Sequence, residues 1–511
     1  MKRASYTFMH IINIASELAP IAKVGGLGDV LLGLSRELSW KGHDIDLIIP
    51  KYDCMDTESI RDFAIYNDSL LSFYKGTWHR NTIWKGWVEN LKVYFIEPHH
   101  PAHFFHRGCF YGCEDDMERY LYFSRAALEF IEKERLSPHI IHLHDWQTAV
   151  IAPLYHELYR LQGAKEAKIV FTIHNIEYQG HCSSSNLDNI GLKGSHYLLP
   201  DIMQDAQYKE AINLVKGAII YADHITTVSP NYAKEVLTPL GGRGLDKTLS
   251  KYQSKFKGIL NGIDYSYWNP EIDRYLPTHY SSREAPASKK DRHTLDKKAY
   301  IKNFLRERLF LAEEHRPIVG CIARLVPQKG IELIKHALHY TLEKKGQFLL
   351  LGSSPIEGIN AEFQQLNRHF HEHPHVRLIL HHSEELAHLI YAASDMFIVP
   401  SLFEPCGLTQ MIALKYGAIP IVRKTGGLAD TIWDVDYSGK TIEKTNGYVF
   451  EYPDAKGIES ALDRAFECWF HHPDRWRQLM IRAMNTDFSW NSPSDEYLNI
   501  YQSILTTEKR S

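Results

Sequence analysis

The sequence predicts an α/β protein with two similar domains, each built on an open parallel β-sheet. Three observations support this prediction. The chain has 511 residues, which is longer than a chain with a single hydrophobic core usually is. Short apolar runs alternate with longer helical patterns along the chain, as expected of successive βα units. Hydrophobic residues make up 44% and charged residues 23% of the chain, which excludes a wholly disordered or coiled-coil protein.

The charge balance and the cysteine content limit the partners and the compartment. Lysine and arginine number 58 and aspartate and glutamate 62, so the net charge of −4 gives no general attraction to nucleic acid or to an anionic membrane. Seven cysteines are an odd and sparse set, which argues against a disulfide framework and favours a reducing, cytoplasmic location. Cys109 and Cys113 lie close in sequence, but no second pair completes a zinc site, so no metal is expected. No stretch approaches the ~18 uninterrupted apolar residues of a membrane span.

In the first half, apolar runs predict strands and the segments between them predict helices. The strands are expected at Phe8–Ala15, Ile45–Ile49, Val93–Ile96, Ile140–Leu143, Ile169–Ile173 and Ile225–Val228. The helices are expected at Asp29–Trp40, Met117–Glu134, Gln147–Leu161 and Lys209–Tyr221. The stretch from Ser281 to Lys298 is rich in Ser, Lys, Arg and Asp, which predicts a solvated insertion rather than core.

The second half repeats the βα pattern. Its strands are expected at Ile318–Ala323, Phe348–Leu351, Val376–Leu380, Met396–Val399 and Ile419–Val422. Its helices are expected at Ile331–Lys345, Glu384–Ala393, Leu408–Tyr416, Ile458–Phe470 and Ser494–Leu505. We therefore predict domains at residues 1–257 and 258–490, with a C-terminal helix in 491–511 that packs back on the first domain. Since parallel sheets bind ligands at the carboxyl ends of their strands, two such sheets facing across a cleft would place a ligand between them.

Two loops with the same pattern follow predicted strands. Lys23–Asp29 and Lys424–Asp430 each contain a cation, a Gly pair, Leu, a small residue and Asp. Gly25 and Gly26 would let the backbone approach a ligand closely, and Lys23 would suit a phosphate. The pattern is neither a P-loop nor a dinucleotide-binding fingerprint, and a tight βα turn alone also favours Gly and Asp.

Charged residues on two loops of the second half form a candidate anion and sugar site. Arg324 and Lys329 lie on the loop after a predicted strand, where two cations can converge on one polyanion. The alternative is two solvated surface charges. Glu404 precedes Pro405 at the end of another strand, so its carboxylate is held on a loop where it could bind sugar hydroxyls or cap the next helix. Cys406 has no histidine base in its motif and is interpreted as structural.

Further polar and aromatic residues stand at strand ends or in strand-like segments. Asp145 and His174 each end a predicted strand, at the ligand-facing edge. Trp78, Trp84 and Trp87, with Tyr74, could form an aromatic surface on which sugar rings stack, or could be alternating strand residues that face the core.

The motifs together resemble one family, that of bacterial glycogen synthases and plant starch synthases. The resemblance runs in order over roughly residues 10 to 490 and is carried by Lys23–Asp29, His144–Trp146, His174–Asn175, Tyr178–Gly180, Asn261–Asp264, Trp268–Pro270, Arg324–Gly330, Glu404–Gln410 and Thr425–Asp430. It implies two Rossmann-like domains facing across a cleft, the GT-B glycosyltransferase architecture. It also implies transfer of glucose from ADP-glucose to the non-reducing end of an α-1,4-glucan such as glycogen, with retention of configuration and without a metal or other cofactor.

The resemblance assigns roles to individual residues. Lys23, with Gly25, Gly26 and Asp29, would bind ADP-glucose, and Arg324 and Lys329 would hold its diphosphate. Glu404 would lie by the glucosyl ring. The remaining implied contacts to donor or acceptor are with Asp145, His174, Asn261, His382, Cys406, Gly407, Leu408 and Thr409, with Tyr178, Trp78, Trp84 and Trp87 as candidates for the acceptor side.

Two departures from the family pattern bear on the donor. The turn Gly352–Pro355 lacks the usual glycine-rich and acidic residues, and His382 stands near the position of a tyrosine that contacts adenine in the family. The same synthesis from UDP-glucose therefore remains an alternative, as does a catalytically silent glucan-binding relative. Sucrose- or trehalose-type transferases carry a second Glu eight positions after the first, where this chain has Ile412.

Overall fold

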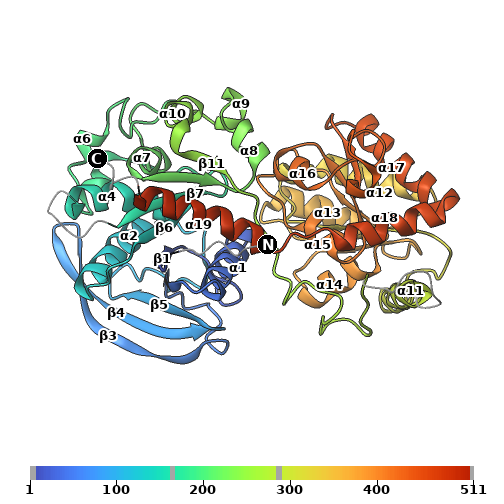
Figure 1. The fold of residues 1–511 in the computed structure, drawn as a ribbon, viewed down its shortest axis with the longest axis horizontal. Coiled ribbons are helices and arrows are strands. Elements are labelled where there is room, and N and C mark those ends of the chain that lie inside the picture. Colours follow the sequence, from blue (N-terminus) through green and yellow to red (C-terminus); the bar gives the residue numbers. More distant parts are fainter. Residues whose placement is uncertain (1–6, 161–166, 283–290, 507–511) are drawn as a thin grey trace. The chain divides into compact units, whose positions relative to one another are not determined.

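The computed structural model describes residues 7–160, 167–282 and 291–506 (Figure 1). The chain forms two compact units. The first comprises Met1–Gly262 with Trp490–Ser511, and the second comprises Ile263–Ser489. The expected boundary after residue 257 lies a few residues before the observed one, and the C-terminal segment belongs to the first unit.

The first unit contains a nine-stranded sheet among its described residues, in the order β11-β10-β7-β6-β1-β2-β5-β4-β3. All neighbours pair in parallel except β4, which runs antiparallel to β5 and β3. The strands are β1 (His10–Ile14), β2 (Asp44–Pro50), β3 (Arg61–Tyr74), β4 (Thr77–Val88), β5 (Leu91–Pro98), β6 (Ile140–His144), β7 (Lys168–Ile173), β10 (His224–Thr227) and β11 (Phe256–Gly258). The central parallel strands are buried along their whole length and are mostly apolar, as expected of strands covered on both faces, which is why the sequence predicted them well.

The β3–β4 hairpin was not predicted as a pair of strands. Its two-residue turn, Lys75–Gly76, has positive φ at both positions (47° and 78°), the geometry that matches the twist of a tight hairpin. Much of β3 is exposed, and its pairing with β4 contains register shifts. These irregularities hide the alternation that would otherwise reveal a half-buried strand.

The helices of the first unit differ from expectation at two places. The predicted helix Gln147–Leu161 is divided into α3 (Trp146–Ala149) and α4 (Ile151–Leu158). The predicted helix Lys209–Tyr221 begins only at Leu214, because Ile212–Asn213 (β9) pairs with His181–Cys182 (β8). The other helices are α1 (Gly26–Trp40), α2 (Asp116–Lys133), α5 (Ser184–Asp188), α6 (Gly194–Tyr197), α7 (Leu214–Tyr221), α8 (Pro230–Glu235), α9 (Pro239–Gly242) and α10 (Asp246–Lys251), with a 3₁₀ turn η2 (Gln253–Lys255).

The C-terminal helix α19 (Asn491–Thr506) packs against α1 in the first unit (Figure 1). The Lys41 ammonium pairs with the Asp495 carboxylate at 2.5 Å. The Tyr501 hydroxyl lies 2.9 Å from Nδ1 of His142, a buried residue of β6. The end of the chain thus contributes to the core of the first unit.

The second unit contains a parallel sheet of six strands among its described residues, in the order β14-β13-β12-β15-β16-β17. The strands are β12 (Ile318–Ile322), β13 (Gln347–Leu351), β14 (Val376–Ile379), β15 (Met396–Val399), β16 (Ile419–Arg423) and β17 (Tyr448–Phe450). The helices are α11 (Asp291–Arg308), α12 (Ile331–Glu343), α13 (Glu357–His369), α14 (Glu384–Ala393), α15 (Thr409–Lys415), α16 (Gly426–Thr431), α17 (Ala455–His471) and α18 (Pro473–Asn485), with 3₁₀ turns η3 (Pro327–Lys329) and η4 (Ile442–Lys444).

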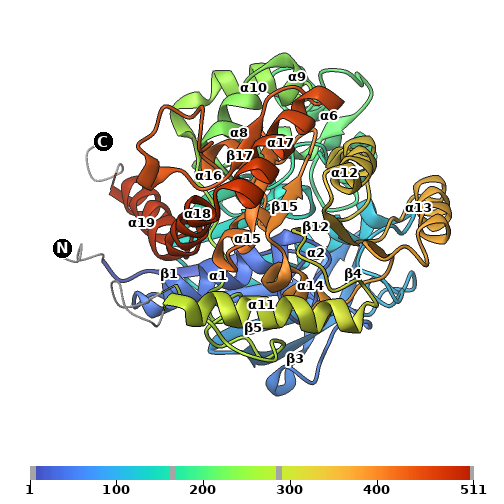
Figure 2. The same ribbon diagram turned by 90° about the vertical axis from the view of Figure 1, so that its right-hand side faces the viewer.

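The prediction of a solvated insertion from Ser281 to Lys298 was wrong for its described end. Helix α11 lies along α14 (Figure 2), and residues 283–290 lie outside the described residues. The Lys298 ammonium is buried and donates to the carbonyls of Ala392 (2.7 Å) and Tyr416 (3.1 Å). The apolar stem of a lysine can pack in a helix interface when its ammonium reaches such acceptors. The polar composition of the segment was therefore not a sufficient sign of exposure.

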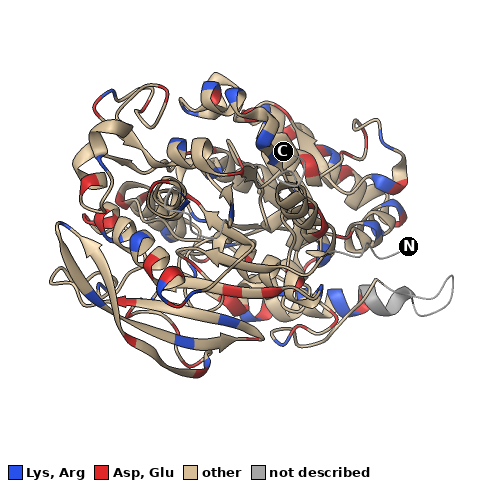
Figure 3. Cartoon of the chain, turned by 60° about the vertical axis from the view of Figure 1, so that its left-hand side comes forward, with Lys and Arg blue, Asp and Glu red and all other residues tan. Residues whose placement is uncertain are grey.

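Charged residues of both signs are interspersed along the surface helices and strands (Figure 3). This distribution agrees with the near balance of 58 basic and 62 acidic residues. Among the described helices, none combines the length and apolar character needed to cross a membrane.

The burial of Lys298 generates a pH-dependent stability prediction. Burial lowers the pKa of Lys298 to about 7, whereas an unfolded lysine titrates near 10.4. Between these values the unfolded chain binds a proton that the folded protein lacks, so this residue makes the free energy of unfolding rise with pH. Lys298→Met lacks that titration. Denaturant unfolding should therefore show the stability of the wild type increasing relative to Lys298→Met from pH 7 to pH 10; a difference independent of pH would contradict the assignment.

Candidate functional site

In the first unit, a carboxylate organises the glycine loop that precedes α1. Glu17 follows β1, and its Oε2 accepts hydrogen bonds from the backbone N–H groups of Val24 (2.9 Å) and Gly25 (3.0 Å). Its Oε1 accepts a hydrogen bond from the Tyr111 hydroxyl at 2.8 Å. Lys23, Val24 and Gly25 are exposed. The Glu17 carboxylate thus holds the backbone of the loop, while the exposed residues of the loop remain accessible to a ligand.

Lys23 is held near the start of α1. Its ammonium pairs with the Asp29 carboxylate at 2.9 Å, and both side chains are about one-third exposed. No described heavy atom lies within 4 Å of the position that a Cβ on Gly25 would take. A negatively charged group could therefore approach Lys23 and the N-terminus of this 15-residue helix, where electrostatics favour an anion.

Asp145 connects the loops after β6 and β7. Its Oδ1 accepts hydrogen bonds from the backbone N–H groups of His174 (2.7 Å) and Asn175 (3.3 Å). Its φ of 58° lies in the left-handed region, which is uncommon for a residue with a side chain. Burial, with a smaller contribution from the negative charge of Glu17, raises the pKa of the Asp145 carboxyl to about 7, although the two backbone donors oppose the shift. A strained backbone and a shifted pKa at a strand end are features of functional sites.

A hydrogen-bond chain assigns the tautomer of His174. Its Nε2 lies 3.0 Å from Nδ1 of His144, whose Nε2 lies 3.2 Å from Oδ1 of Asn13. Since the Asn13 oxygen can only accept, His144 carries its proton on Nε2, so its Nδ1 accepts the proton of His174 Nε2. Burial lowers the pKa of His174 to about 3, so the ring is neutral at pH 7. Nδ1 of His174 is then an acceptor for a ligand hydroxyl.

Other predicted residues of the first unit occupy different settings. Asn261 is buried, and its side-chain oxygen has no hydrogen-bond partner among the described residues. Tyr178 is 61% exposed. Asn261 thus offers an unsatisfied acceptor, and Tyr178 offers an open aromatic face.

The tryptophans of β4 do not form one aromatic surface. Trp78 is 56% exposed. Trp84 stacks on Phe63 at 5.0 Å and donates its Nε1–H to Glu97 at 2.7 Å. Trp87 is an odd number of residues from both, so strand alternation places it on the other face. Tyr74, which was expected with them, is buried.

In the second unit, the loop after β12 comes against the loop after β15. Gly330 adopts φ 74°, and a Cβ there would lie 2.4 Å from the carbonyl oxygen of Pro400. The N–H of Leu402 donates to the carbonyl of Gln328 at 2.8 Å. These contacts position Lys329 beside the second loop, and only glycine fits at the point of closest approach.

Glu404 is buried at this junction, and its carboxylate is held by two donors. Its Oε2 lies 2.5 Å from the Lys329 ammonium and accepts a hydrogen bond from the Ser401 hydroxyl at 2.8 Å. The guanidinium of Arg423 donates to the carbonyls of Ser401 and Leu402, which fixes the same loop. The following helix α15 begins at Thr409 with Leu408 as its N-cap, so Glu404 does not serve as a helix cap.

The second glycine pair has a packing role. A Cβ on Gly426 would lie 1.9 Å from the carbonyl oxygen of Glu404, and one on Gly427 would lie 2.0 Å from that of Cys406. The N–H of Gly427 also donates to the Glu404 carbonyl at 3.0 Å. The pattern shared with Lys23–Asp29 thus lets two backbones touch in the second unit.

The remaining predicted residues of the second unit lie on the loop that follows Glu404 or apart from it. Cys406 and Gly407 are buried, and the buried Gln410 donates to both of their carbonyls at 3.1 and 2.8 Å. Arg324 is exposed. The His382 side chain is 86% exposed and lies 3.5 Å from the Glu384 carboxylate. His382 is therefore accessible to a ligand but is not held in place by packing.

Each unit offers groups that could bind part of a phosphorylated sugar. Lys23 in the first unit, and Arg324 and Lys329 in the second, supply positive charge at strand ends. Glu404 and His174 supply acceptors for hydroxyls. Among the described residues, no group of three or more His, Cys, Asp or Glu side chains is placed to hold a metal ion.

Sequence reasoning missed the supporting residues. It did not identify Glu17, Tyr111, Ser401 or Arg423 as parts of the site. For Glu17 a signal existed, because it stands two residues after the end of the first predicted strand, as Asp145 stands two residues after another. Ser401 and Arg423 act through backbone and carboxylate contacts that become visible only when the loops are assembled.

The glycine contact beneath Glu404 can be tested by stability. Gly426→Ala places a methyl group against the Glu404 carbonyl, so it should lower the free energy of unfolding by more than about 2 kcal/mol. Gly439→Ala is the matched control, because Gly439 also has positive φ (64°) but no atom within 4 Å of its Cβ position. That control should lose only about 1 kcal/mol. Equal losses in denaturant unfolding would show that the Gly426 contact does not hold the loop.

Comparisons with known proteins agree with this arrangement. A family model described as "Starch synthase catalytic domain" matches residues 10–251, and one described as "Glycosyl transferases group 1" matches residues 305–480. A glycogen synthase of Protochlamydia amoebophila is 69% identical over 97% of this chain and 99% of that protein. Probable starch synthase 4 of Arabidopsis thaliana is 48% identical over 96% of this chain and 47% of that protein.

One solved structure closely matches the whole fold. It is the catalytic domain of starch synthase IV from Arabidopsis thaliana bound to ADP and acarbose, with a TM-score of 0.94 and 48% sequence identity over 98% of this chain and 100% of that one. Both units have α/β sheets with parallel cores, and the chain is 69% identical to a glycogen synthase over nearly its full length. The chain therefore belongs to the glycogen synthase and starch synthase family of glycosyltransferases and has their GT-B fold.

Proposed function

We propose that this enzyme is a glycogen synthase that transfers glucose from ADP-glucose to the non-reducing end of an α-1,4-glucan, with retention of configuration. The observation that carries the proposal is the buried Glu404 carboxylate, held by Lys329 and Ser401 at a strand end of the second unit. The 69% identity to a glycogen synthase supports the reaction class. ADP as the nucleotide is supported by the starch synthase IV structure, which is described as bound to ADP.

Arg324 and Lys329 are proposed to bind the diphosphate of the donor. Breaking the bond between glucose and phosphate builds negative charge on the leaving group, so fixed cations stabilise the transition state. Lys329 is pre-positioned by its ion pair with Glu404. Arg324 is exposed and could close on the phosphate when the donor binds. Gly407, Leu408 and Thr409 are proposed to line this phosphate and sugar site, with the buried Cys406 supporting the loop from within.

Glu404 is proposed to lie by the glucosyl ring, where positive charge develops on the anomeric carbon. A buried carboxylate in fixed geometry stabilises that charge without reorganising. Its partners Lys329 and Ser401 hold it in one position. We found no second carboxylate paired with it within the described part of the second unit, so we favour a front-face reaction in which the leaving phosphate accepts the proton of the attacking hydroxyl.

The first unit is proposed to bind the donor through Lys23 and the Gly25–Gly26 turn, with Asp29 as the resting partner of Lys23. His174 is proposed to accept a hydrogen bond from a glucose hydroxyl through Nδ1, since its other nitrogen donates to His144. Asp145 is proposed to orient donor and acceptor by fixing the His174 backbone. Asn261, with its buried unsatisfied oxygen, is proposed as a further substrate contact.

The acceptor is proposed to be an α-glucan, and the chemistry assigned above uses no metal. Exposed aromatic faces suit stacking on sugar rings. Trp78 and Tyr178 are exposed and are the better candidates, whereas Trp84 is engaged with Phe63 and Glu97. His382 is proposed near the adenine, where its exposed ring can stack.

The donor is tested by a nucleotide-release assay with glycogen as acceptor. We expect turnover with ADP-glucose to exceed turnover with UDP-glucose. Preference for UDP-glucose would overturn the assignment of the donor, but the assignment of the reaction as glucan synthesis would stand. Absence of turnover with both donors, despite glucan binding, would favour a catalytically silent glucan-binding protein.

Two substitutions separate chemistry from donor binding. Glu404→Gln should lower kcat by roughly 10²–10³ with little change in the KM for donor, because it removes charge stabilisation in the transition state. Lys23→Ala should raise the KM for donor roughly tenfold with a smaller effect on kcat, because it removes a charge-assisted contact with the phosphate.

Lys424→Ala is the matched control for Lys23→Ala. Lys424 opens the corresponding loop of the second unit, but its 58% exposed side chain pairs with Glu451 at 2.6 Å. Its substitution should leave both kinetic constants unchanged. If Lys424→Ala raised the KM as much as Lys23→Ala, the effect of Lys23 would be general electrostatics and not a specific contact.

A further inference from the structure

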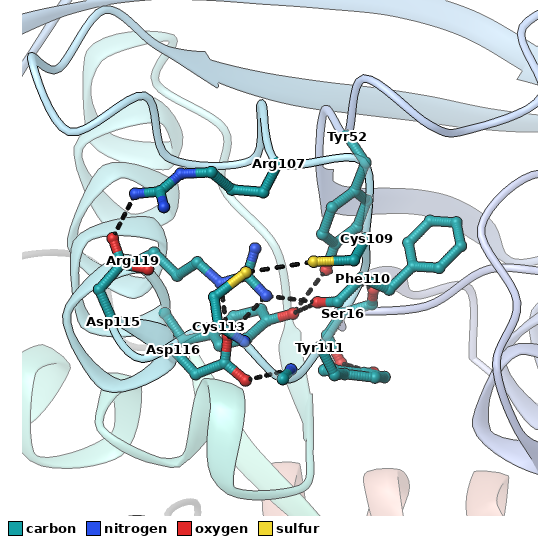
Figure 4. A network of polar contacts seen from close by, with 12 residues as sticks. Ser16, Tyr52, Arg107, Cys109, Phe110, Tyr111, Cys113, Asp115, Asp116 and Arg119 are labelled. Carbon is teal, nitrogen blue, oxygen red and sulfur yellow. Dashed lines mark hydrogen bonds and ion pairs between the residues drawn. The ribbon is translucent and has the colours of Figure 1, made fainter. Parts of the chain in front are cut away.

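Two cysteines whose thiols are in contact lie close to the glycine loop of the first unit. The Sγ atoms of Cys109 and Cys113 are 3.1 Å apart, and both residues are partly exposed (Figure 4). A disulfide requires a sulfur separation of about 2.05 Å, so the thiols need to approach by only about 1 Å. Gly108 precedes this segment and Gly112 lies within it; both have positive φ (66° and 92°) and open space at the Cβ position, while their N–H groups donate to the carboxylates of Asp53 (3.0 Å) and Asp116 (2.8 Å).

The segment between the cysteines is connected to the glycine loop. Tyr111 donates its hydroxyl hydrogen to Glu17 and lies 2.8 Å from the Ser16 hydroxyl. Glu17 in turn accepts the N–H groups of Val24 and Gly25, beside Lys23. A displacement of Tyr111 therefore reaches the proposed donor-binding loop through a single carboxylate.

The neighbouring residue Phe110 resists displacement. Its carbonyl accepts hydrogen bonds from the Arg119 guanidinium at 2.6 Å and the Tyr120 hydroxyl at 2.7 Å, and both of these residues are buried in α2 (Figure 4). Because the Phe110 carbonyl is held, we expect an approach of the two sulfur atoms to move Tyr111 and to strain the hydrogen bond from the Gly112 N–H to the Asp116 carboxylate (2.8 Å).

We propose that Cys109 and Cys113 form a reversible disulfide by exchange with a low-molecular-weight disulfide, and that this oxidation displaces Tyr111 and weakens donor binding at Lys23. The site is a thiol modification site outside the residues assigned to catalysis. Its effect on donor binding rests on the proposed function, whereas formation of the disulfide does not.

The exchange proceeds in two balanced steps. The Cys109 thiolate attacks one sulfur of the small disulfide, whose S–S bond breaks and releases the first small thiolate. Cys113 then loses its proton and attacks Sγ of Cys109, which releases the second. The two cysteines are oxidised, the small disulfide is reduced to two thiols, and these take up the two protons. Burial, with the hydrogen bond to Cys109, raises the pKa of Cys113, which disfavours Cys113 as the first attacking thiolate.

The chemical step is tested by mass spectrometry after incubation with oxidised glutathione. The exposed Cys54 is first replaced (Cys54→Ser) to remove a competing thiol. We expect this protein to lose two hydrogens, to carry a Cys109–Cys113 link in its peptides without retained glutathione, and to revert with dithiothreitol. Adding Cys113→Ser should trap one glutathione on Cys109. Stable glutathione on both cysteines of the Cys54→Ser protein, or no reaction at either, would overturn the proposal.

The coupling to the glycine loop is tested by hydrogen–deuterium exchange and by kinetics. Oxidation of the Cys54→Ser protein should speed exchange in the peptide that contains Val24 and Gly25, and should raise the KM for ADP-glucose roughly tenfold, the loss expected for a hydrogen bond to a charged group. Tyr111→Phe should raise this KM by itself, and oxidation should then add little. The double variant Cys54→Ser with Cys113→Ser cannot form the disulfide. When it is treated with an oxidant that adds no glutathione, it should show neither the faster exchange nor the higher KM.

The outcomes separate the two proposals. Unchanged exchange at Val24 and Gly25 in the fully oxidised protein would overturn the coupling. If the reduced enzyme failed to use ADP-glucose, the proposed function would fail, yet the peptide mapping and the exchange measurement would still decide whether the disulfide forms and reaches the loop.

Discussion

The contact between the loops after β15 and β16 determines the candidate site of the second unit. Gly426 and Gly427 lie so close to the carbonyls of Glu404 and Cys406 that no side chain fits between them. Because the backbone at Glu404 is fixed in this way, its carboxylate is directed to Lys329 and Ser401 rather than to solvent. A buried carboxylate without such partners would be costly, so the ion pair and the hydroxyl make its burial possible.

The first unit uses a carboxylate for a different purpose. Glu17 binds two backbone N–H groups and a tyrosine hydroxyl, so it organises a loop instead of facing a substrate. Asp145 acts similarly on the backbone at His174. Lys23, which pairs with Asp29 at 2.9 Å, is exposed, and the neutral ring of His174 is partly exposed. Rigid support behind a small number of accessible polar groups is the arrangement that catalysis by positioning requires.

Much of the fold could be predicted from the sequence because the buried parallel strands are short segments rich in apolar residues. Strands such as β6 and β15 were predicted within a residue or two of their observed ends. The β3–β4 hairpin was missed because exposure and register shifts obscure its alternation. Helix α11 was misjudged because the buried ammonium of Lys298 depends on carbonyls from Ala392 and Tyr416, which are distant in sequence.

The candidate site, like the fold, could be predicted from the sequence only in part. Residues at strand ends, such as Asp145 and Glu404, could be recognised from position and residue type. Their partners could not be recognised, because the contacts that give them a role form only in the folded chain. Examples are Ser401 with Glu404 and Asn13 with His144. For the tryptophans of β4 the sequence left two interpretations, one aromatic surface or alternating strand residues, and strand alternation places Trp87 on the face opposite Trp78 and Trp84.

The most direct measurement is a crystal structure of this protein with bound ADP. We expect phosphate oxygens within about 3 Å of the Arg324 guanidinium and the Lys329 ammonium, at the edge of the sheet where Glu404 is buried. ADP bound elsewhere, with both cations directed into solvent, would contradict it.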